Sequence, residues 1–160
     1  MADHRHIDLA VEGAKAGGRQ PVEVEPLGDD EYRVLYSPGL VEGIAAGDVI
    51  RVTDFDRGLF QVVTRGGNIA VKFAAREPIA GVLPGLRADL EALGARLDGA
   101  IGKAAVWTIP LAAGFAQIET VMSAAVARTP GSGWWYGNVY DEGGDPLHWW
   151  EKAHDGRQRR

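Results

Sequence analysis

The sequence predicts an α+β protein: a small N-terminal antiparallel β-sheet or partial barrel, followed by a ferredoxin-like βαββαβ unit. Two observations lead to this prediction. Up to about Phe73, short runs rich in β-branched residues alternate with turn residues, as in short antiparallel strands. From Asn68 onward, two stretches with helical periodicity lie between strand-like runs. With 46% hydrophobic and 24% charged residues, a chain of 160 residues can bury a substantial core.

The first part of the chain is predicted to form short strands joined by tight turns. Residues 31–36 carry an aromatic or β-branched side chain at every second position, which places these side chains on one face of a strand. Residues 27–30 suit a tight hairpin, and residues 54–58 suit a longer one in which Gly58 takes a positive φ. The expected strands cover residues 7–11, 21–25, 31–36, 48–53 and 58–64.

The second part is predicted to contain two helices. Within residues 78–93, apolar side chains recur at the spacing of one helix face, and Gly94 suits the C-cap position. A second helix is expected after Pro110. Its apolar stripe consists of Phe115, Ile118, Met122 and Val126. The expected strands of this part cover residues 68–74, 96–100, 103–109 and 134–140.

This order of elements divides the chain into three parts. Strand, helix, strand, strand, helix, strand is the order of the split βαβ plan. We expect an N-terminal β unit over residues 1–67, the ferredoxin-like unit over residues 68–141, and a C-terminal tail with aromatic and basic residues over 142–160. Two helices on one face of the second sheet leave its other face for the N-terminal unit or for a partner.

Aromatic residues are concentrated near the C-terminal end. Four of the five tryptophans and two of the four tyrosines lie between Trp134 and Trp150. On a strand, Trp134, Tyr136 and Tyr140 share one face, and Trp135 points to the other. The cluster is therefore either packed between a helix and the C-terminal segment or exposed as an aromatic surface for a partner.

Charge is unevenly distributed along the chain, whose net charge is -5. Residues 21–60 hold nine acidic and three basic side chains, a balance of -6, whereas residues 61–110 hold four acidic and six basic ones, a balance of +2. An acidic surface repels phosphate backbones and attracts basic proteins. The distribution disfavours nucleic acid as a partner and favours a basic protein.

Residues 43–52, Gly-Ile-Ala-Ala-Gly-Asp-Val-Ile-Arg-Val, combine two glycines with an aspartate at the start of a strand. Asp48 is expected to accept hydrogen bonds from backbone amides of this turn. With neighbouring segments, these residues resemble the bacterial domain-of-unknown-function 4265 family over roughly residues 21–140. The neighbouring segments are residues 24–34, 56–63 and 65–71. The resemblance implies a two-part architecture and brings no catalytic residue and no cofactor.

Residues suited to catalysis or metal binding are sparse. Cysteine is absent, which excludes thiolate nucleophiles and cysteine-ligated metals. No histidine lies between Ile7 and Leu147, so a histidine metal site would require His4, His6 and His148 to meet. The serines lack the strand-turn-helix setting of a nucleophile elbow, and the glycine pairs lack the helix of a phosphate loop. We predict no catalytic residue, no cofactor and no metal ligand.

The sequence favours a non-enzymatic bacterial binding protein, since no catalytic arrangement is found. We expect it to be cytoplasmic, because the sequence shows neither a membrane span nor the apolar core of a secretion signal. Tryptophan and tyrosine are typical of interface hot spots, and acidic neighbours would steer a basic partner, such as a toxin masked by an immunity-type inhibitor. The candidate partner-binding residues are Trp134, Tyr136, Tyr140, Asp141, Glu142 and Trp149. The alternative is a small-molecule-binding protein or enzyme with a pocket between the two units, lined by Trp107, Trp135 or Trp149.

Overall fold

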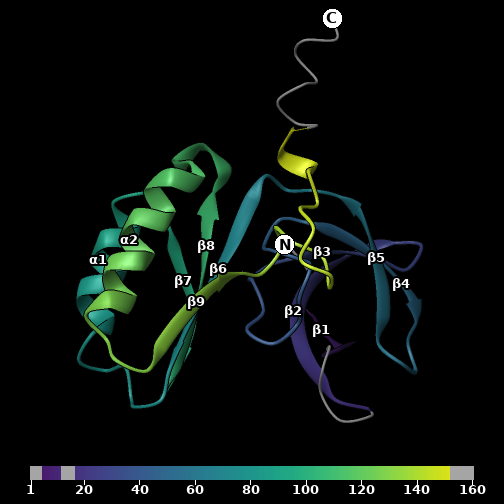
Figure 1. Ribbon diagram of the computed structural model, residues 1–160. Coiled ribbons are helices and arrows are strands. Elements are labelled where there is room, and N and C mark those ends of the chain that lie inside the picture. The colour runs from purple at the N-terminus through teal and green to yellow at the C-terminus, as the bar shows by residue number, and fades with distance from the viewer. Residues whose placement is uncertain (1–4, 12–16, 152–160) are drawn as a thin grey trace, which may run out of the picture.

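The computed structural model describes residues 5–11 and 17–151. Within these residues the chain forms two antiparallel β-sheets and two α-helices, and both helices pack on the second sheet (Figure 1). This confirms a mixed α and β protein built mostly from strands. None of the described helices is long and apolar enough to cross a membrane. We call the parts that carry the two sheets the first unit and the second unit.

The first unit is a meander of antiparallel strands. Its strands are β1 (Arg5–Ala10), β2 (Arg19–Gly28), β3 (Glu31–Val34), β4 (Val49–Asp54) and β5 (Leu59–Thr64), paired in that order. The Ala10 amide donates a hydrogen bond of 2.9 Å to the Gly58 carbonyl, so the end of β1 reaches the turn between β4 and β5. The sheet therefore curls around its own core, in which Val24, Val34 and Ile50 are fully buried.

The second unit places its two helices on one face of a sheet with the order β7-β8-β6-β9. In chain order its elements are β6 (Asn68–Ala75), α1 (Leu83–Glu91), β7 (Arg96–Ile101), β8 (Ala104–Pro110), a 3₁₀ turn (Leu111–Ala113), α2 (Phe115–Ala127) and β9 (Ser132–Tyr136). The predicted apolar face of β6 is fully buried. Val71 and Phe73 belong to one core with Leu90 of α1 and Ile118 of α2.

The first helix starts later than its periodicity predicts. α1 begins at Leu83 and has Pro84 in its first turn, where a proline removes no intrahelical hydrogen bond. Ahead of it, the Ile79 carbonyl accepts hydrogen bonds from the amides of Val82 and Leu83, at 3.0 and 2.8 Å. Residues 79–82 therefore form a turn that leads into the helix.

The closing strand is shorter than predicted. β9 ends at Tyr136 instead of Tyr140, and the side chain of Asn138 continues the pairing with β6. Asn138 Oδ1 accepts from the Ala70 amide at 3.0 Å, and its Nδ2 donates to the Asn68 carbonyl at 2.9 Å. A side-chain amide carries both a donor and an acceptor, so it satisfies the two backbone groups that a longer strand would have paired.

Residues 142–151 return to the second unit, so this part of the predicted tail belongs to a core. Trp149 is 9% exposed and donates its indole N–H to the Asn138 carbonyl at 2.8 Å. Leu147 and Trp150 pack against the same core. The ring of Trp150 lies 5.3 Å from that of Phe115 on α2. The basic end of the predicted tail, residues 152–160, lies outside the described residues.

Candidate functional site

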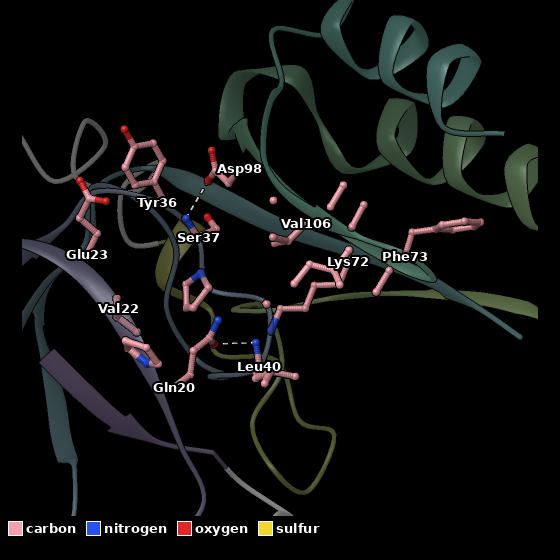
Figure 2. A pocket seen from close by; sticks show the side chains of 18 of the residues that line it. Gln20, Val22, Glu23, Tyr36, Ser37, Leu40, Lys72, Phe73, Asp98 and Val106 are labelled. Atoms are coloured by element: carbon pink, nitrogen blue, oxygen red, sulfur yellow. Dashed lines mark hydrogen bonds between the residues drawn. The ribbon is translucent and has the colours of Figure 1, made fainter. Parts of the chain in front are cut away.

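A cavity of about 520 Å³ lies between the two units. Figure 2 shows that both units form its wall: β2 and the segment after β3 on one side, and strands of the second sheet on the other. Small-molecule sites in proteins typically have volumes of roughly 300–1,000 Å³ and often lie where two structural units meet. The cavity therefore has the size and position of a ligand site.

The floor of the cavity is one row of residues across the second sheet. Trp135 of β9 lies opposite Lys72 of β6 in the register. Val106 of β8 lies opposite Lys72 on one side and opposite Gly99 of β7 on the other. All four residues line the cavity, on the sheet face that the helices do not cover. The alternation that sends Phe73 into the helix-covered core therefore also produces the cavity floor.

The opposite wall includes a loop that Gln20 holds in place. The loop comprises residues 36–40 and follows β3. Gln20 Oε1 accepts a hydrogen bond from the Leu40 amide at 2.9 Å (Figure 2) and another from the Val41 amide at 3.2 Å. Val22, two residues further along β2, also lines the cavity. These bonds fix the loop above the floor.

Lys72 is a buried cation in the middle of the floor. Its side chain is 2% exposed, and Nζ donates hydrogen bonds to Glu42 Oε2 at 2.5 Å and to the Val41 carbonyl at 3.2 Å. Burial lowers the pKa of Lys72, and the nearby Glu42 carboxylate opposes this effect. Because Glu42 belongs to the first unit, this ion pair also joins the two units.

Asp98 is a buried anion on β7. Its Oδ2 accepts hydrogen bonds from the Ser37 amide at 2.7 Å and from the Thr108 hydroxyl at 2.5 Å. Arg96 Nε donates to Asp98 Oδ1 at 2.6 Å. The guanidinium of Arg96 also lies 4.9 Å from the centre of the Tyr36 ring. Asp98 therefore connects the edge of the second sheet to the loop that covers the cavity.

The hydroxyl groups beside Asp98 form a chain in which each proton already has an acceptor. Thr108 donates its proton to Asp98, so Ser37 Oγ is the donor in the contact of 2.6 Å between Ser37 and Thr108. Ser37 Oγ also accepts from the Ala46 amide at 3.0 Å. The proton of Ser37 is directed to a threonine and not to a general base, so this serine is not arranged as a nucleophile.

The predicted aromatic surface does not form on the helix side of β9. Tyr136 is 9% exposed, and its ring lies 5.5 Å from that of Phe115. Its hydroxyl donates to Glu119 Oε2 at 3.0 Å, and burial raises the pKa of Tyr136, which keeps the hydroxyl protonated. Trp134 is half-buried and packs edge-on against Tyr136 at 4.9 Å. Tyr136 is a core residue and Trp134 packs against the same core, because α2 covers this face of the strand.

The other four candidate residues lie in two environments. Trp149 is buried in the core of the second unit. Tyr140, Asp141 and Glu142 are exposed in a turn that is closed by a bridge between Tyr140 and Pro146. Asp141 Oδ1 accepts hydrogen bonds of 2.9 Å from two amides of this turn. Of the six candidate residues, the three in this turn form the exposed aromatic and acidic surface.

Trp135 lines the cavity, as the alternative hypothesis predicts for one of three tryptophans. Its side chain is 42% exposed, on the face of β9 opposite Trp134. Trp107 and Trp149 do not line the cavity, because both lie in the core between the second sheet and the elements that cover it. Trp135 therefore differs from Trp107 and Trp149 because it points to the face of the second sheet that the helices do not cover.

The described histidines have separate partners. His6 Nε2 lies 3.8 Å from Glu23 Oε1, and His148 Nδ1 lies 2.7 Å from Glu151 Oε2. The predicted meeting of His4 with the other histidines concerns a residue outside the described part of the chain. Within that described part, no group of three or more histidine, aspartate and glutamate side chains is placed to hold a metal ion.

Asp48 has the structural role that its position in the turn predicts. Its Oδ2 accepts hydrogen bonds from the Ala45 amide at 3.0 Å and from Arg65 Nη1 at 3.1 Å, and its Oδ1 accepts from the Gly66 amide at 2.8 Å. Complete burial raises the pKa of Asp48 against the effect of these bonds. Arg65 also lies 5.7 Å from the centre of the Trp149 ring, which connects this turn to the C-terminal segment.

Lys72 and Asp98 are site residues that the sequence-based prediction missed. Lys72 stands between Val71 and Phe73 in a strand that is otherwise uncharged and, after Asn68, apolar. A single charge in the middle of such a strand is a usable signal, because lysine is rarely buried unless it has a partner. Asp98 has no comparable signal, since it occurs in a polar stretch near a strand edge.

Comparisons with known proteins identify the family. A family model described as domain of unknown function (DUF4265) matches residues 21–145. The crystal structure of a hypothetical protein from Neisseria gonorrhoeae is similar in fold, with a TM-score of 0.65 at 11% identity over 86% of this chain and 94% of that chain. No curated protein matches the sequence. Because the family model covers well over half of the chain, the protein belongs to the DUF4265 family of domains of unknown function.

Proposed function

We propose that this protein binds a small molecule in the cavity between its two units. The observation that carries the proposal is the cavity of about 520 Å³, which persists at a junction otherwise closed by hydrogen bonds. The cavity is a cleft open to solvent, because its wall combines buried side chains with exposed apolar ones. A cleft of this size between two tightly joined units is typical of a ligand site.

The junction around the cavity is held by polar contacts from several elements. The Gly43 amide donates to the Gly137 carbonyl at 2.7 Å, on the side of β9. Lys72 and Glu42 pair across the middle, and the Ser37 amide bonds Asp98 on the side of β7. A site fixed in this way loses less conformational entropy when a ligand binds.

We propose binding and not catalysis because the reactive groups of the wall are engaged with other residues. The Lys72 ammonium is held by Glu42 and its side chain is only 2% exposed, which denies it access to a substrate, and the Ser37 hydroxyl donates to Thr108. An amine or hydroxyl nucleophile needs a base that accepts its proton, or a lowered pKa together with access to the substrate. The wall therefore supports recognition better than a covalent reaction.

A blocking substitution tests the proposal. Ala104 lies at the exposed end of the cavity floor, so Ala104→Trp should fill the opening without disturbing a core. Ala80→Trp, at an exposed turn position outside the cavity wall, is the matched control. We expect a thermal-shift screen of small molecules to give ligands that raise the melting temperature of the wild type and of Ala80→Trp, and not that of Ala104→Trp. Ligands that stabilise all three proteins equally would contradict a site in this cavity.

The finer fold assignment is also a proposal. The order β7-β8-β6-β9, with both helices on one face, supports a ferredoxin-like plan for the second unit. An experimental structure with a right-handed crossover through each helix is the expected result. A left-handed crossover would contradict the assignment.

A second candidate function is binding of a basic protein, such as a toxin, by a cytoplasmic immunity-type inhibitor. The supporting observation is the exposed turn with Tyr140, Asp141 and Glu142, in which Tyr140 is 49% exposed. Tagged wild-type protein and Tyr140→Ala should then differ in their capture of one basic protein from a lysate. Equal capture by both would remove this turn as the interface.

A further inference from the structure

The cavity wall carries its charge in internally neutralised pairs. From this we infer that the ligand is an uncharged, largely apolar molecule, an inference that rests on the proposed binding function. Among the described residues that line the cavity, Lys72 and Asp98 have buried ionisable side chains, and each is paired with a side chain of opposite charge type in the same chain. A charged ligand group would leave water without gaining a counter-charge, which is unfavourable.

An anionic ligand would have to compete with Glu42 for Lys72. The Nζ to Oε2 distance is 2.5 Å, and the Val41 carbonyl accepts a second hydrogen bond from the same ammonium. The Glu42 side chain is 36% exposed, so part of its carboxylate remains solvated while it is paired. Sites that select carboxylates or phosphates present arginine or lysine donors to the ligand. Here the buried Lys72 ammonium already donates to Glu42 and to the Val41 carbonyl.

A cationic ligand meets the same situation at Asp98. One oxygen accepts from the Ser37 amide and the Thr108 hydroxyl, and Arg96 donates to both oxygens, at 2.6 and 3.3 Å. A carboxylate offers about four acceptor positions. Three of the four contacts reach Oδ2 and one reaches Oδ1, so most of the acceptor positions are occupied, and Arg96 balances the charge.

The rest of the wall offers mainly apolar contacts. Val22 and Leu40 line the cavity from the first unit, and Val106 and Trp135 line it from the second. Ile101, at the tip of the β7–β8 hairpin, also lines it and is 84% exposed, and Leu40 is 59% exposed. A ligand that covered these side chains would remove apolar surface from water, which is the main favourable term for such a site.

Ionisable groups of the wall that contact water lie at one margin of the cavity. Glu23 and His6 pair there at 3.8 Å, with side chains that are 29% and 65% exposed. A polar end of the ligand can stay hydrated at this margin while the apolar body contacts Val106 and Trp135. The part of the ligand that enters the cavity is the part that we infer to be uncharged.

Probe pairs that differ in charge test this inference. N-phenylnaphthylamine is uncharged, and anilinonaphthalene sulfonate is an anion of similar shape; methylnaphthalene and naphthylmethylammonium form the matching neutral and cationic pair. Fluorescence measures binding of the first pair, and displacement of N-phenylnaphthylamine measures binding of the second. We expect each uncharged probe to bind at least about tenfold more tightly than its charged counterpart, because no counter-charge is available. Ala104→Trp should lose this binding and Ala80→Trp should retain it.

A variant that leaves Lys72 unpaired shows whether charged probes are rejected because Lys72 is neutralised or only because the wall is apolar. Glu42→Gln removes the carboxylate that neutralises Lys72 and keeps the size of the side chain. We expect the affinity for anilinonaphthalene sulfonate to rise at least about tenfold in this variant, because the Lys72 ammonium becomes available as a counter-charge. The affinity for N-phenylnaphthylamine should stay the same. If Glu42→Gln does not fold, Arg96→Gln gives the converse test: Asp98, which lines the cavity, loses its neutralising partner, so the affinity for naphthylmethylammonium should rise.

The outcomes distinguish the inference from the proposed function. Equal affinity of the wild type for charged and uncharged probes, with both blocked by Ala104→Trp, would overturn the inference and leave a binding site in place. Unchanged sulfonate affinity in a folded Glu42→Gln variant would also overturn it. If the thermal-shift screen yields no ligand and no probe shows binding that Ala104→Trp blocks, the proposed function itself fails.

Discussion

Ser37 and Asp98 are joined across the boundary between the two units by a hydrogen bond of 2.7 Å from the Ser37 amide to Asp98 Oδ2. The Asp98 side chain is completely buried and also binds Thr108 and Arg96. Removing one member of a buried charged network leaves the other groups without partners. The loss in unfolding free energy is then large, even where the intact network is no more stable than apolar side chains in its place. The carboxylate should therefore be important for the stability of the joined units.

Asp98→Ala is expected to lower the free energy of unfolding by about 3–5 kcal/mol. The substitution removes the acceptor for the Ser37 amide and the Thr108 hydroxyl and leaves Arg96 without its carboxylate. Urea denaturation followed by circular dichroism measures the change. Thr108→Val keeps the shape of the threonine and should cost less, about 1–3 kcal/mol, because it removes one link of the chain. A loss below about 1 kcal/mol for Asp98→Ala would contradict the role given to this network.

The lowered pKa of Lys72 predicts how the unfolding free energy changes at alkaline pH. Burial lowers its pKa in the folded protein from the ordinary 10.5, so between the lowered value and 10.5 the unfolded chain binds more protons at this site than the folded chain does. Stability must then rise with pH across that interval and become level above it. The difference in unfolding free energy between wild type and Lys72→Met should therefore increase, in favour of the wild type, from the lowered pKa towards pH 10.5. A difference that stays level up to pH 10.5 and decreases above it would show that the pKa is raised.

Gly66 and Gly85 make opposite predictions for substitution by alanine. A Cβ on Gly66 would lie 2.4 Å from the Gly47 carbonyl carbon, so Gly66→Ala must push two backbone segments apart. We expect a loss of about 1–3 kcal/mol in unfolding free energy. Gly85 is exposed in α1 with open space around it, and Gly85→Ala should stabilise the protein by about 0.5–1 kcal/mol. Thermal denaturation of both variants measures these changes, and stabilisation by Gly66→Ala would contradict the close approach.

The strands and helices are largely predictable because their signals are local. In β6 the alternation of Ile69, Val71 and Phe73 is enough to identify both the strand and its buried face. The end of β9 is not predictable in this way. Asn138 replaces backbone pairing by side-chain pairing, and this depends on where the Ala70 amide lies in space.

The cavity is less predictable because it depends on how the two units meet. Alternation places Trp134 and Trp135 on opposite faces, and this separation is correct. It does not determine which face α2 covers, and that choice packs Trp134 against the core and makes Trp135 a wall residue. In the same way, the loop that covers Lys72 is positioned by Gln20, a residue of a distant strand.

Alanine substitution of Tyr136 and Trp135 tests this division of β9 directly. Tyr136→Ala should lower the unfolding free energy by about 3–5 kcal/mol, because it leaves a cavity beside Phe115 in the core. Tyr136→Phe keeps the ring and should cost only about 1 kcal/mol, the net value of the bond to Glu119.

Trp135→Ala, one residue away, should leave stability nearly unchanged, because the side chain is 42% exposed on the other face. It should instead weaken binding of N-phenylnaphthylamine, since the indole ring forms part of the cavity wall. Urea denaturation and probe fluorescence on the same three variants give both quantities. If Trp135→Ala proved as destabilising as Tyr136→Ala, the indole would be part of a core and not of a binding surface. If Trp135→Ala left probe binding intact, the contact between ligand and β9 would be absent.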